Sequence, residues 1–513
     1  MATNLATLMS GSRVLPGEQL QHRVGQAAGA MRALGLEPGH VVCMLMRNDF
    51  PILEVALAAE RIGVVAVPLN WHASSEDLEH ILKDAGARVL VAHTDLLNKV
   101  PSVPAGCVVM QVAPPPEVRA AYRLSEAESA LGDGVTEYET WLTSAQTVHE
   151  ATASPPFRLL YTSGSTGRPK GVRRDTSSAS ISAAMSLRTR VAHGMESGPV
   201  RAVMTGPLYH SAPYAYSLNC VRMGELLALQ PRFDAAQLLD LIGQLKISHL
   251  HAVPTMFARL LDLPEAIKAA ADVSSLRSVA HGAAMCPRDV KHSMLRWWGP
   301  VLYEYYAATE IGVMAACTSQ EWLDHPGTVG RPPPGVTIRI VDDTGTLLPT
   351  GGVGEILVRS DVVPSVSYQN LPEALSGLRR DGGWATLGDI GYQDEDGFLW
   401  LCDRKSDLVI SGGVNIFPAE VEQAVLRLSG VKDCIVFGIP DRDLGEALAL
   451  YVEADEGVRL NAQDLRAGVL EELGRLRVPR VIRVVDSLPR EDSGKLARRK
   501  MKARYLEEAP PPV

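Results

Sequence analysis

From Gly17 to about Ala92, helical stretches alternate with short, continuous apolar runs. Three stretches carry apolar side chains at the spacing of an amphipathic helix: residues 22–36, 50–63 and 74–86. The apolar runs between and after them are residues 40–46, 64–69 and 88–93. Such runs are typical of strands buried in a parallel sheet, with the helices as crossovers. The pattern therefore predicts a parallel α/β unit, and its first turn lacks the glycine-rich sequence of a dinucleotide-binding fold.

The sequence pattern changes four times after this unit. Residues 100–155 are rich in Pro, Ala, Glu and Thr with weak periodicity, which predicts a connection over the surface. Strand–helix alternation then resumes, short strands separated by glycine turns follow, and a compact α+β tail begins after Arg404. We predict an α/β fold with an N-terminal core over residues 1–403 and a C-terminal domain over residues 404–513. The core divides into α/β subdomains of about residues 1–155 and 156–326 and a β-rich part, a small β-barrel or twisted antiparallel sheet, over residues 327–403.

Composition narrows the class of protein. With 513 residues the chain is too long for a single core, and 46% hydrophobic with 21% charged residues is ordinary for a soluble globular protein. A net charge of -9 argues against electrostatic binding of nucleic acid. The seven cysteines are scattered without a CxxC pair, which favours the reducing cytoplasm over a disulfide framework or a zinc site. The sequence shows no signal peptide and no apolar run of the ~20 residues that span a bilayer, so we expect a soluble cytoplasmic protein.

The stretch from Tyr161 to Val172 reads YTSGSTGRPKGV and is the strongest candidate for chemistry. Glycines let several N–H groups converge into an anion-binding nest, hydroxyl groups add donors, and Lys170 adds a cation. The apolar run before it predicts a loop that leaves a strand, where open α/β sheets place ligands. A Walker loop needs glycine directly before the lysine and Ser or Thr after it, so Pro169 and Gly171 exclude that motif. The candidate phosphate ligands are Thr162, Ser163, Gly164, Ser165, Thr166, Gly167 and Lys170.

Four later clusters carry candidate chemistry, and each also has a structural alternative. They read YEYYAATE at 303–310, LGDIG at 387–391, DRKSDLVISGGVNIFPAEVE at 403–422 and PREDSGKLARR at 489–499. The structural alternatives are an aromatic strand end with a polar cap, a turn-forming aspartate, a glycine β-turn and a solvated lysine. Their order along the chain is more informative than any single cluster.

Together the five motifs resemble the signatures of adenylate-forming enzymes, the superfamily of acyl-CoA synthetases, amino-acid adenylation domains and luciferases. The resemblance covers essentially the whole chain. The sequence looks most like those of bacterial acyl-CoA synthetases, including fatty-acid and aryl-acid ligases. It implies that a carboxylic acid and ATP with Mg²⁺ give an acyl-adenylate and pyrophosphate. A small, mobile C-terminal domain would then rotate, and a thiol, coenzyme A, would attack the adenylate.

The resemblance also implies roles for single residues. Tyr306 would stack on adenine, Thr309 would bond a phosphate, and Glu310, with Thr166, would hold Mg²⁺. Asp389 would bind both ribose hydroxyls, with Arg404 facing the ribose or phosphate. Lys495 would reach the substrate carboxylate and α-phosphate, where negative charge builds during attack.

Softer assignments follow from the same resemblance. Gly412 and Gly413 would let the backbone approach the pantetheine arm of coenzyme A, and Ser406 occupies a hinge position that is usually Asp or Lys. His210 matches an aromatic–histidine gate of the acyl pocket, and Gly282, Ala283 and Ala284 match the loop beside the adenine. The pocket walls would come from His210, Tyr214, His281 and Tyr305. For His210 and His281, a buried core histidine is the competing interpretation.

Three alternatives stay open. An amine could intercept the adenylate, which would make the protein an amide bond synthetase, or the acyl group could pass to a carrier protein. A non-catalytic nucleotide sensor is the third, although every named catalytic position keeps its expected residue type. The acid itself and the oligomeric state, for which a homodimer is one option, are not determined by the sequence.

Overall fold

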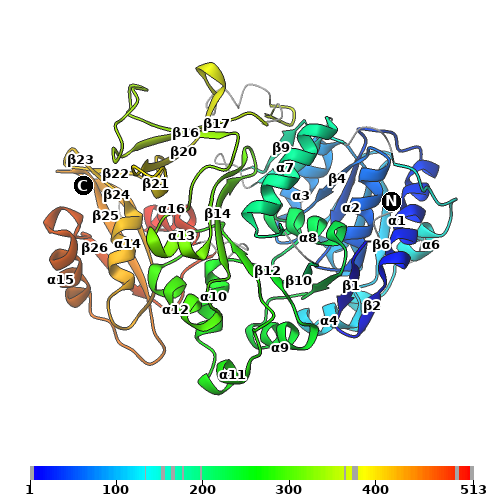
Figure 1. The fold of residues 1–513 in the computed structure, drawn as a ribbon, viewed down its shortest axis with the longest axis horizontal. Helices are drawn as coiled ribbons and strands as arrows, with labels where there is room; N and C mark the ends of the chain where they lie inside the picture. The colour runs from blue at the N-terminus through cyan, green and yellow to red at the C-terminus, as the bar shows by residue number, and fades with distance from the viewer. Residues whose placement is uncertain are drawn as a thin grey trace. The chain divides into compact units, whose positions relative to one another are not determined.

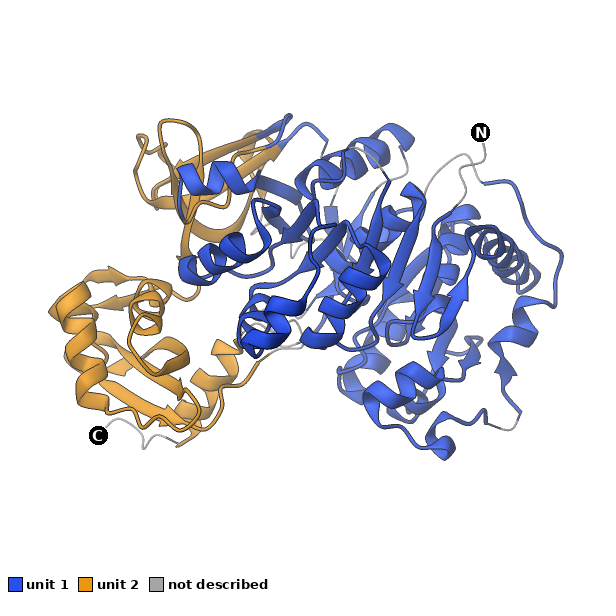
Figure 2. Cartoon of the chain, turned by 60° about the horizontal axis from the view of Figure 1, so that its bottom comes forward, with its two compact units in different colours: residues 1–326, 333–336, 360–377 blue, residues 327–332, 337–359, 378–513 orange. Residues whose placement is uncertain are grey.

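The computed structural model describes residues 5–132, 134–151, 156–162, 168–175, 178–196, 199–362, 366–371, 379–490 and 496–508. The chain forms two compact units, which Figure 2 colours separately. Unit 1 comprises residues 1–326, 333–336 and 360–377, and unit 2 comprises residues 327–332, 337–359 and 378–513. Figure 1 traces the elements of both in chain order.

The first sheet of unit 1 confirms the parallel α/β unit. Its strands pair in parallel in the order β4-β3-β5-β6-β7. They are β3 (Val41–Leu45), β4 (Val65–Pro68), β5 (Ala87–His93), β6 (Val108–Val112) and β7 (Thr136–Glu137). The accompanying helices are α1 (Gly17–Ala33), α2 (Phe50–Arg61), α3 (Ser75–Ala85), α4 (Pro116–Tyr122), α5 (Glu126–Ser129) and α6 (Tyr138–Leu142). Helix α3 begins at an N-cap, Ser74, whose side chain accepts a hydrogen bond from Asp77 N, and it ends at left-handed Gly86.

Helix α2 differs from its expected amphipathic character. Every residue from Phe50 to Ala59 is buried, including Glu54. The Glu54 carboxylate accepts hydrogen bonds from Arg23 at 2.6 and 3.0 Å and from the Tyr138 hydroxyl at 2.8 Å. A charge inside the core is tolerated here because each carboxylate oxygen has a donor.

The second sheet contains eight strands in the order β15-β14-β13-β12-β10-β11-β1-β2. They are β1 (Thr7–Ser10), β2 (Arg13–Leu15), β10 (Arg201–Met204), β11 (Leu226–Leu229), β12 (His249–Ala252), β13 (Ser278–His281), β14 (Leu302–Ala308) and β15 (Gly312–Cys317). The helices of this region are α7 (Ala179–Ala192), α8 (Ser211–Met223), α9 (Ala235–Leu245), α10 (Pro254–Leu261), α11 (Glu265–Ala270), α12 (Arg288–Trp298) and α13 (Ser319–Asp324). Strands β1 and β2 lie far from the others in sequence, yet β1 pairs in parallel with β11.

A third, three-stranded sheet carries the candidate phosphate loop. Strands β8 (Arg158–Thr162), β9 (Lys170–Arg174) and β18 (Val366–Tyr368) pair antiparallel in the order β18-β9-β8. The loop therefore leaves a strand, as expected, but it returns as a second strand rather than opening into a helix. It is the connection of a hairpin, unlike the strand-to-helix turns at which open parallel sheets bind ligands.

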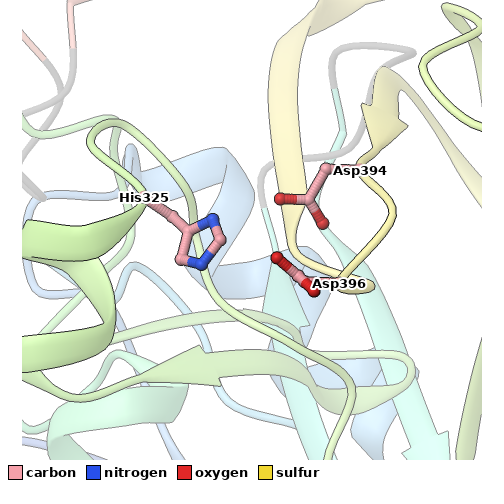
Figure 3. Close-up of side chains that lie close together, drawn as sticks. All are labelled: His325, Asp394 and Asp396. Atoms are coloured by element: carbon pink, nitrogen blue, oxygen red, sulfur yellow. The ribbon is translucent and has the colours of Figure 1, made fainter.

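Unit 2 contains an antiparallel sheet over the β-rich part of the sequence. Its strands are β16 (Val336–Val341), β17 (Gly354–Ser360), β19 (Arg379–Arg380), β20 (Trp384–Gln393) and β21 (Leu399–Arg404). Strand β20 pairs antiparallel with β17, β19 and β21. Asp394 and Asp396, whose side chains Figure 3 draws, lie in the turn from β20 to β21, and the Asp394 carboxylate closes that turn by accepting the Phe398 N–H at 2.8 Å.

The remainder of unit 2 is a second five-stranded sheet with helices, as the α+β tail predicts. The strands are β22 (Val409–Ser411), β23 (Val414–Ile416), β24 (Val431–Asp441), β25 (Gly445–Ala454) and β26 (Val481–Val485). The helices are α14 (Pro418–Leu426), α15 (Ala462–Leu473) and α16 (Arg498–Glu508). Within the described residues, no helix is both long and apolar enough to cross a membrane. All seven cysteines are free thiols.

Candidate active site

The carboxyl ends of neighbouring parallel strands bring several predicted site residues to one edge of the eight-stranded sheet. Strands β10, β12, β13 and β14 pair in parallel, so the segments that follow them leave the sheet at the same edge. His210 lies after β10, Gly282–Ala284 directly after β13, and Thr309 with Glu310 directly after β14. Thr309 and Glu310 form the tight turn between β14 and the antiparallel β15, and both are half-buried.

Glu310 and the phosphate-loop hairpin are connected through Tyr368 on β18. The Tyr368 hydroxyl lies 3.4 Å from Glu310 Oε1, and Lys170 Nζ lies 5.6 Å from the centroid of the Tyr368 ring. Burial, followed by the charge of Glu310, raises the pKa of Tyr368 to about 12, so the hydroxyl stays protonated and donates to the carboxylate. Two candidate site residues from distant motifs are thus brought together by a tyrosine that sequence reasoning missed.

The rear of the hairpin is fixed to α3. Tyr161 donates a hydrogen bond of 2.6 Å to Asp84 Oδ2, and Asn370 Nδ2 donates to the Asp84 carbonyl at 2.9 Å. Gly171 has no room for a side chain, since a Cβ would lie 2.9 Å from Tyr161 Cζ and 3.0 Å from Leu159 Cδ1. Thr162 and Lys170 are register partners at the two ends of the loop. Ser163, Gly164, Ser165, Thr166 and Gly167 lie outside the described residues.

The predicted adenine loop is strained and closely packed. Ala283 has φ +71°, a left-handed value that L side chains rarely adopt, and Ala283 and Ala284 are exposed. A Cβ on Gly282 would lie 2.7 Å from the Tyr305 carbonyl oxygen, so this position requires glycine. Strain of this kind costs about 1–3 kcal/mol and is typical of ligand-binding loops.

His281 and Tyr305 lie in the core below that loop. His281 is fully buried on β13, and burial first, then the Lys291 charge, keeps the pKa of its imidazole well below the usual value. Tyr305 is also buried and shares a hydrogen bond of 2.7 Å between its hydroxyl and His251 Nε2. The burial of His281 matches the competing interpretation as a core histidine, although neither ring nitrogen has a hydrogen-bond partner among the described residues. The bond to His251 occupies the Tyr305 hydroxyl within the protein.

His210 and Tyr214 stand on the first turn of α8. His210 is the N-cap residue of that helix, and its ring lies 4.4 Å from the Tyr209 ring, centroid to centroid. Tyr214 N donates to the His210 carbonyl at 3.0 Å, and both side chains are half-buried. Burial is the main cause that raises the pKa of Tyr214. The two residues are therefore neighbours, one turn apart.

In unit 2, Asp389 and Arg404 are direct register partners on β20 and β21. Arg404 Nε lies 3.3 Å from Asp389 Oδ1; the aspartate is buried and the arginine is exposed. Lys405 N donates to the Gly388 carbonyl at 2.7 Å, which fixes the turn before Asp389 against the end of β21. The motifs at 387–391 and 403–422 thus form one cluster.

Beyond this cluster, Gly412 and Gly413 have φ of +56° and +81° and form the tight connection from β22 to β23. Positive φ at both residues is what a two-residue hairpin turn requires, so the β-turn interpretation holds. Ser406 Oγ donates to Asp407 Oδ1 at 3.3 Å in the expected hinge. Lys495 lies outside the described residues.

Arg498 is a second functional candidate that sequence reasoning missed, because the basic run 498–504 predicts a solvated helix face. Instead, its guanidinium contacts Glu422 Oε2 at 2.8 Å, Asp407 Oδ2 at 2.9 Å and Asp403 Oδ1 at 3.4 Å. These acidic groups raise the pKa of Arg498 despite its burial. Arg498 thus connects α16 to both sides of the expected hinge.

Comparisons with known proteins identify the family of the chain. Residues 6–366 match the AMP-binding enzyme family, and residues 420–495 match the AMP-binding enzyme C-terminal domain. The chain is 30% identical to a fatty acid–[acyl-carrier-protein] ligase of Streptomyces coeruleorubidus, covering 98% of this chain and 94% of the relative. It is also 30% identical to a feruloyl-CoA synthase of an Amycolatopsis species, covering 98% and 97%.

Among solved structures, the fold is similar to the amide bond synthetase McbA of Marinactinospora thermotolerans, with 28% identity, a TM-score of 0.82 and coverage of 98% of this chain and 97% of that one. ATP-bound MatB of Rhodopseudomonas palustris gives a TM-score of 0.85 at 26% identity, covering 99% and 97%. The resemblance read from the five motifs is confirmed. The chain belongs to the AMP-binding enzyme family and is an ATP-dependent, AMP-forming acid ligase of the acyl-CoA synthetase type.

Proposed function

We propose that this enzyme adenylates a fatty or aryl carboxylic acid and then transfers the acyl group to coenzyme A. The observation that carries the proposal is the contact of Tyr368 with both Glu310 and Lys170, because it brings the acidic residue of one motif to the phosphate-loop hairpin of another. An anionic triphosphate at this hairpin would meet Lys170 and the hydroxyls of the loop. The carboxylate would stand beside it.

The donor set at Glu310 fits a divalent cation. The Tyr368 hydroxyl donates a hydrogen bond to Glu310 Oε1, whereas no described residue donates one to Glu310 Oε2. Carboxylate and hydroxyl oxygens are the ligands that Mg²⁺ prefers, so Glu310 and Thr166 would hold the ion. When bound, Mg²⁺ neutralises charge on the phosphates. The protein itself would hold the phosphates through Thr162–Gly167 and Thr309.

Further binding roles follow for the remaining residues. Tyr306 would stack on adenine beside Gly282–Ala284, and Asp389 with Arg404 would hold the ribose. Lys495 would meet the negative charge that builds as the acid carboxylate attacks the α-phosphate, and one such charge is worth ~3–4 kcal/mol. His210, Tyr214, His281 and Tyr305 would border the acid.

The second half-reaction would use the hinge. We place the domain boundary at Asp403–Lys405, so that residues 404–513 rotate about the segment with Ser406 and bring Gly412 and Gly413 to the pantetheine arm. Free thiols at all seven cysteines support a reducing compartment, the cytoplasm.

Two acceptors other than coenzyme A have specific support. One structural relative is an amide bond synthetase, and one sequence relative is an acyl-carrier-protein ligase. The purified enzyme, ATP, Mg²⁺ and a panel of fatty and aryl acids would be incubated with coenzyme A, with an amine or with a carrier protein. We expect pyrophosphate release followed by a thioester of coenzyme A. An amide, or acylated carrier protein, with no coenzyme A thioester would overturn the assignment of the acceptor.

The first half-reaction has its own test. ATP–pyrophosphate exchange measures adenylation without any acceptor, and Lys495→Ala should reduce its rate by roughly 100- to 1000-fold. Exchange that survives this substitution unchanged would refute the role of Lys495. Exchange with none of the acids would contradict the proposed acid class.

A further inference from the structure

The β8–β9 hairpin carries two arginines at the end remote from its loop. Arg158 and Arg174 are direct register partners, so their side chains leave the same face of the sheet. The alternation of side chains puts Thr162 and Lys170, at the loop, on that face as well. Like charges directly opposite each other destabilise a strand pair, so two facing arginines are unfavourable on their own.

Arg174 is buried, and none of the acidic residues that the structure describes pairs with it. Only 8% of the residue is exposed, yet no described residue accepts a hydrogen bond from its guanidinium or forms an ion pair with it. Burial and then the charge of Arg158 lower the pKa of Arg174 to about 10, and the attraction of Glu310 is weaker than either. Buried charges are normally paired, because desolvating a lone ion costs several kcal/mol. The arrangement is therefore incomplete without an anion.

A small anion can reach this guanidinium. Some buried side-chain nitrogen and oxygen atoms of the described residues have neither solvent contact nor a hydrogen-bond partner, and the guanidinium nitrogens of Arg174 do not belong to this group. These nitrogens are therefore accessible to solvent. Gly312, two residues after Glu310, has no side chain and therefore leaves room beside the Arg174 guanidinium. A Cβ placed on Gly312 would have Arg174 Nη1 as its nearest non-adjacent atom, at 3.9 Å. The space lies next to the Thr309–Glu310 turn.

Arg158 extends the positive region toward α8. Its charge interacts with Tyr214, the residue that we expect in the wall of the acid pocket. The nearby acid, Glu60, already forms an ion pair with Arg222 and is exposed. Arg158 itself has no hydrogen bond or ion pair with a described side chain.

Distance along the hairpin separates the arginines from the phosphate site. Lys170 and Arg174 are four residue steps apart along β9, which at 3.2–3.4 Å per residue is about 13 Å. An anion that bridges Arg158 and Arg174 would therefore bind at the opposite end of the hairpin from the loop that holds the phosphates. It lies on the side of Tyr214 and Gly312.

We propose that Arg158 and Arg174 bind a second carboxylate on the acid substrate, at the end remote from the carboxylate that is adenylated. The proposal rests on the proposed acid ligase function and specifies its substrate class as dicarboxylic acids. Guanidinium groups match a carboxylate with two parallel hydrogen bonds, so two arginines would neutralise one carboxylate and remove their mutual repulsion.

The test compares straight-chain monocarboxylic and dicarboxylic acids of matched length in ATP–pyrophosphate exchange. The variants are Arg174→Leu, Arg158→Leu and the control Arg173→Leu. Arg173 lies on the same strand but on the opposite face, over the Phe157 ring. We expect the wild-type enzyme and the control to prefer dicarboxylic acids, and Arg174→Leu to lose roughly 10- to 100-fold in kcat/KM for them alone. Arg158→Leu should act in the same direction.

Thermal unfolding gives a readout that does not depend on activity. Without ligand, Arg174→Leu should raise Tm, because it removes an unpaired buried charge. A dicarboxylic acid should raise the Tm of the wild-type protein but not of the variant. A fall in exchange that is equal for all acids, with a higher KM for ATP, would overturn the proposal in favour of a phosphate site. A lower Tm for Arg174→Leu would overturn it in favour of a structural role.

No preference for dicarboxylic acids, with monocarboxylic acids still exchanged, would refute this inference and leave the acid ligase function intact. No exchange with any acid would count against both. The two failures are therefore distinguishable.

Discussion

Asp389 and Arg404 lie directly opposite each other on β20 and β21, with Arg404 Nε 3.3 Å from Asp389 Oδ1. The pair holds a buried carboxylate at a strand edge, and its exposed guanidinium stays within reach of a ligand. A carboxylate in this position can accept hydrogen bonds from two neighbouring hydroxyls of a ribose.

Asp389→Ala should raise the KM for ATP by roughly 10- to 100-fold, because hydrogen bonds to a charged acceptor are worth about 1.5–3 kcal/mol. The sharper measurement compares ATP with 2′-deoxy-ATP. The wild-type enzyme should discriminate between them, and the variant should not. If Asp389→Ala weakened both nucleotides equally and kept the discrimination, the ribose assignment would be wrong.

Tyr368→Phe should change the Mg²⁺ dependence of adenylation without preventing folding. The substitution removes the hydroxyl that donates to Glu310 Oε1 and keeps the ring beneath Lys170. A carboxylate freed from this bond can reorient, so we expect the half-saturating Mg²⁺ concentration to shift by roughly 3- to 10-fold, consistent with a net hydrogen bond of about 1 kcal/mol. Glu310→Gln should abolish the stimulation of adenylation by Mg²⁺ at low Mg²⁺ concentrations. An unchanged titration curve for both variants would exclude Glu310 as the metal ligand.

Stability should fall as the pH drops from about 6.5 to about 4. Burial lowers the pKa of His251 from 6.5 to about 4, so in this window the unfolded chain binds a proton that the folded chain does not. The folded state is therefore favoured above pH 6.5 and loses up to about 3 kcal/mol per such histidine as the pH falls. Calorimetric Tm values across this range would measure the effect. His251→Gln should flatten the slope, whereas the exposed His22, changed to Gln, should leave it as steep as in the wild type.

Arg498→Met should destabilise unit 2 and impair the thioester step more than adenylation. It leaves the half-buried Glu422 without its cation, and breaking a fully buried ion pair would cost about 3–5 kcal/mol, an upper bound for this pair. Single-turnover measurements would separate adenylate formation from transfer to coenzyme A. Arg499→Met is the matched control, since Arg499 is exposed on the same helix. Equal loss in both steps would speak against a specific effect on the hinge.

Much of the fold followed from local pattern. The continuous apolar runs 40–46 and 88–93 became β3 and β5, and the glycine turns after residue 327 became an antiparallel sheet. The full burial of helix α2 was harder to predict, because the pairing of Glu54 with Arg23 and Tyr138 depends on side chains from α1 and α6. A charged residue in a helix looks solvent-facing unless its distant partners are known.

The sequence by itself determined the family, the order of its motifs and the residue types at the site, because each motif is a contiguous run whose chemistry is local. Only the tertiary structure decided that β1 joins β11, that the phosphate loop closes a hairpin, and that Tyr368 stands between Lys170 and Glu310. It also decided that Arg158 faces Arg174. Strand pairing and burial bring together residues far apart in sequence, and neither leaves a periodic trace in the chain.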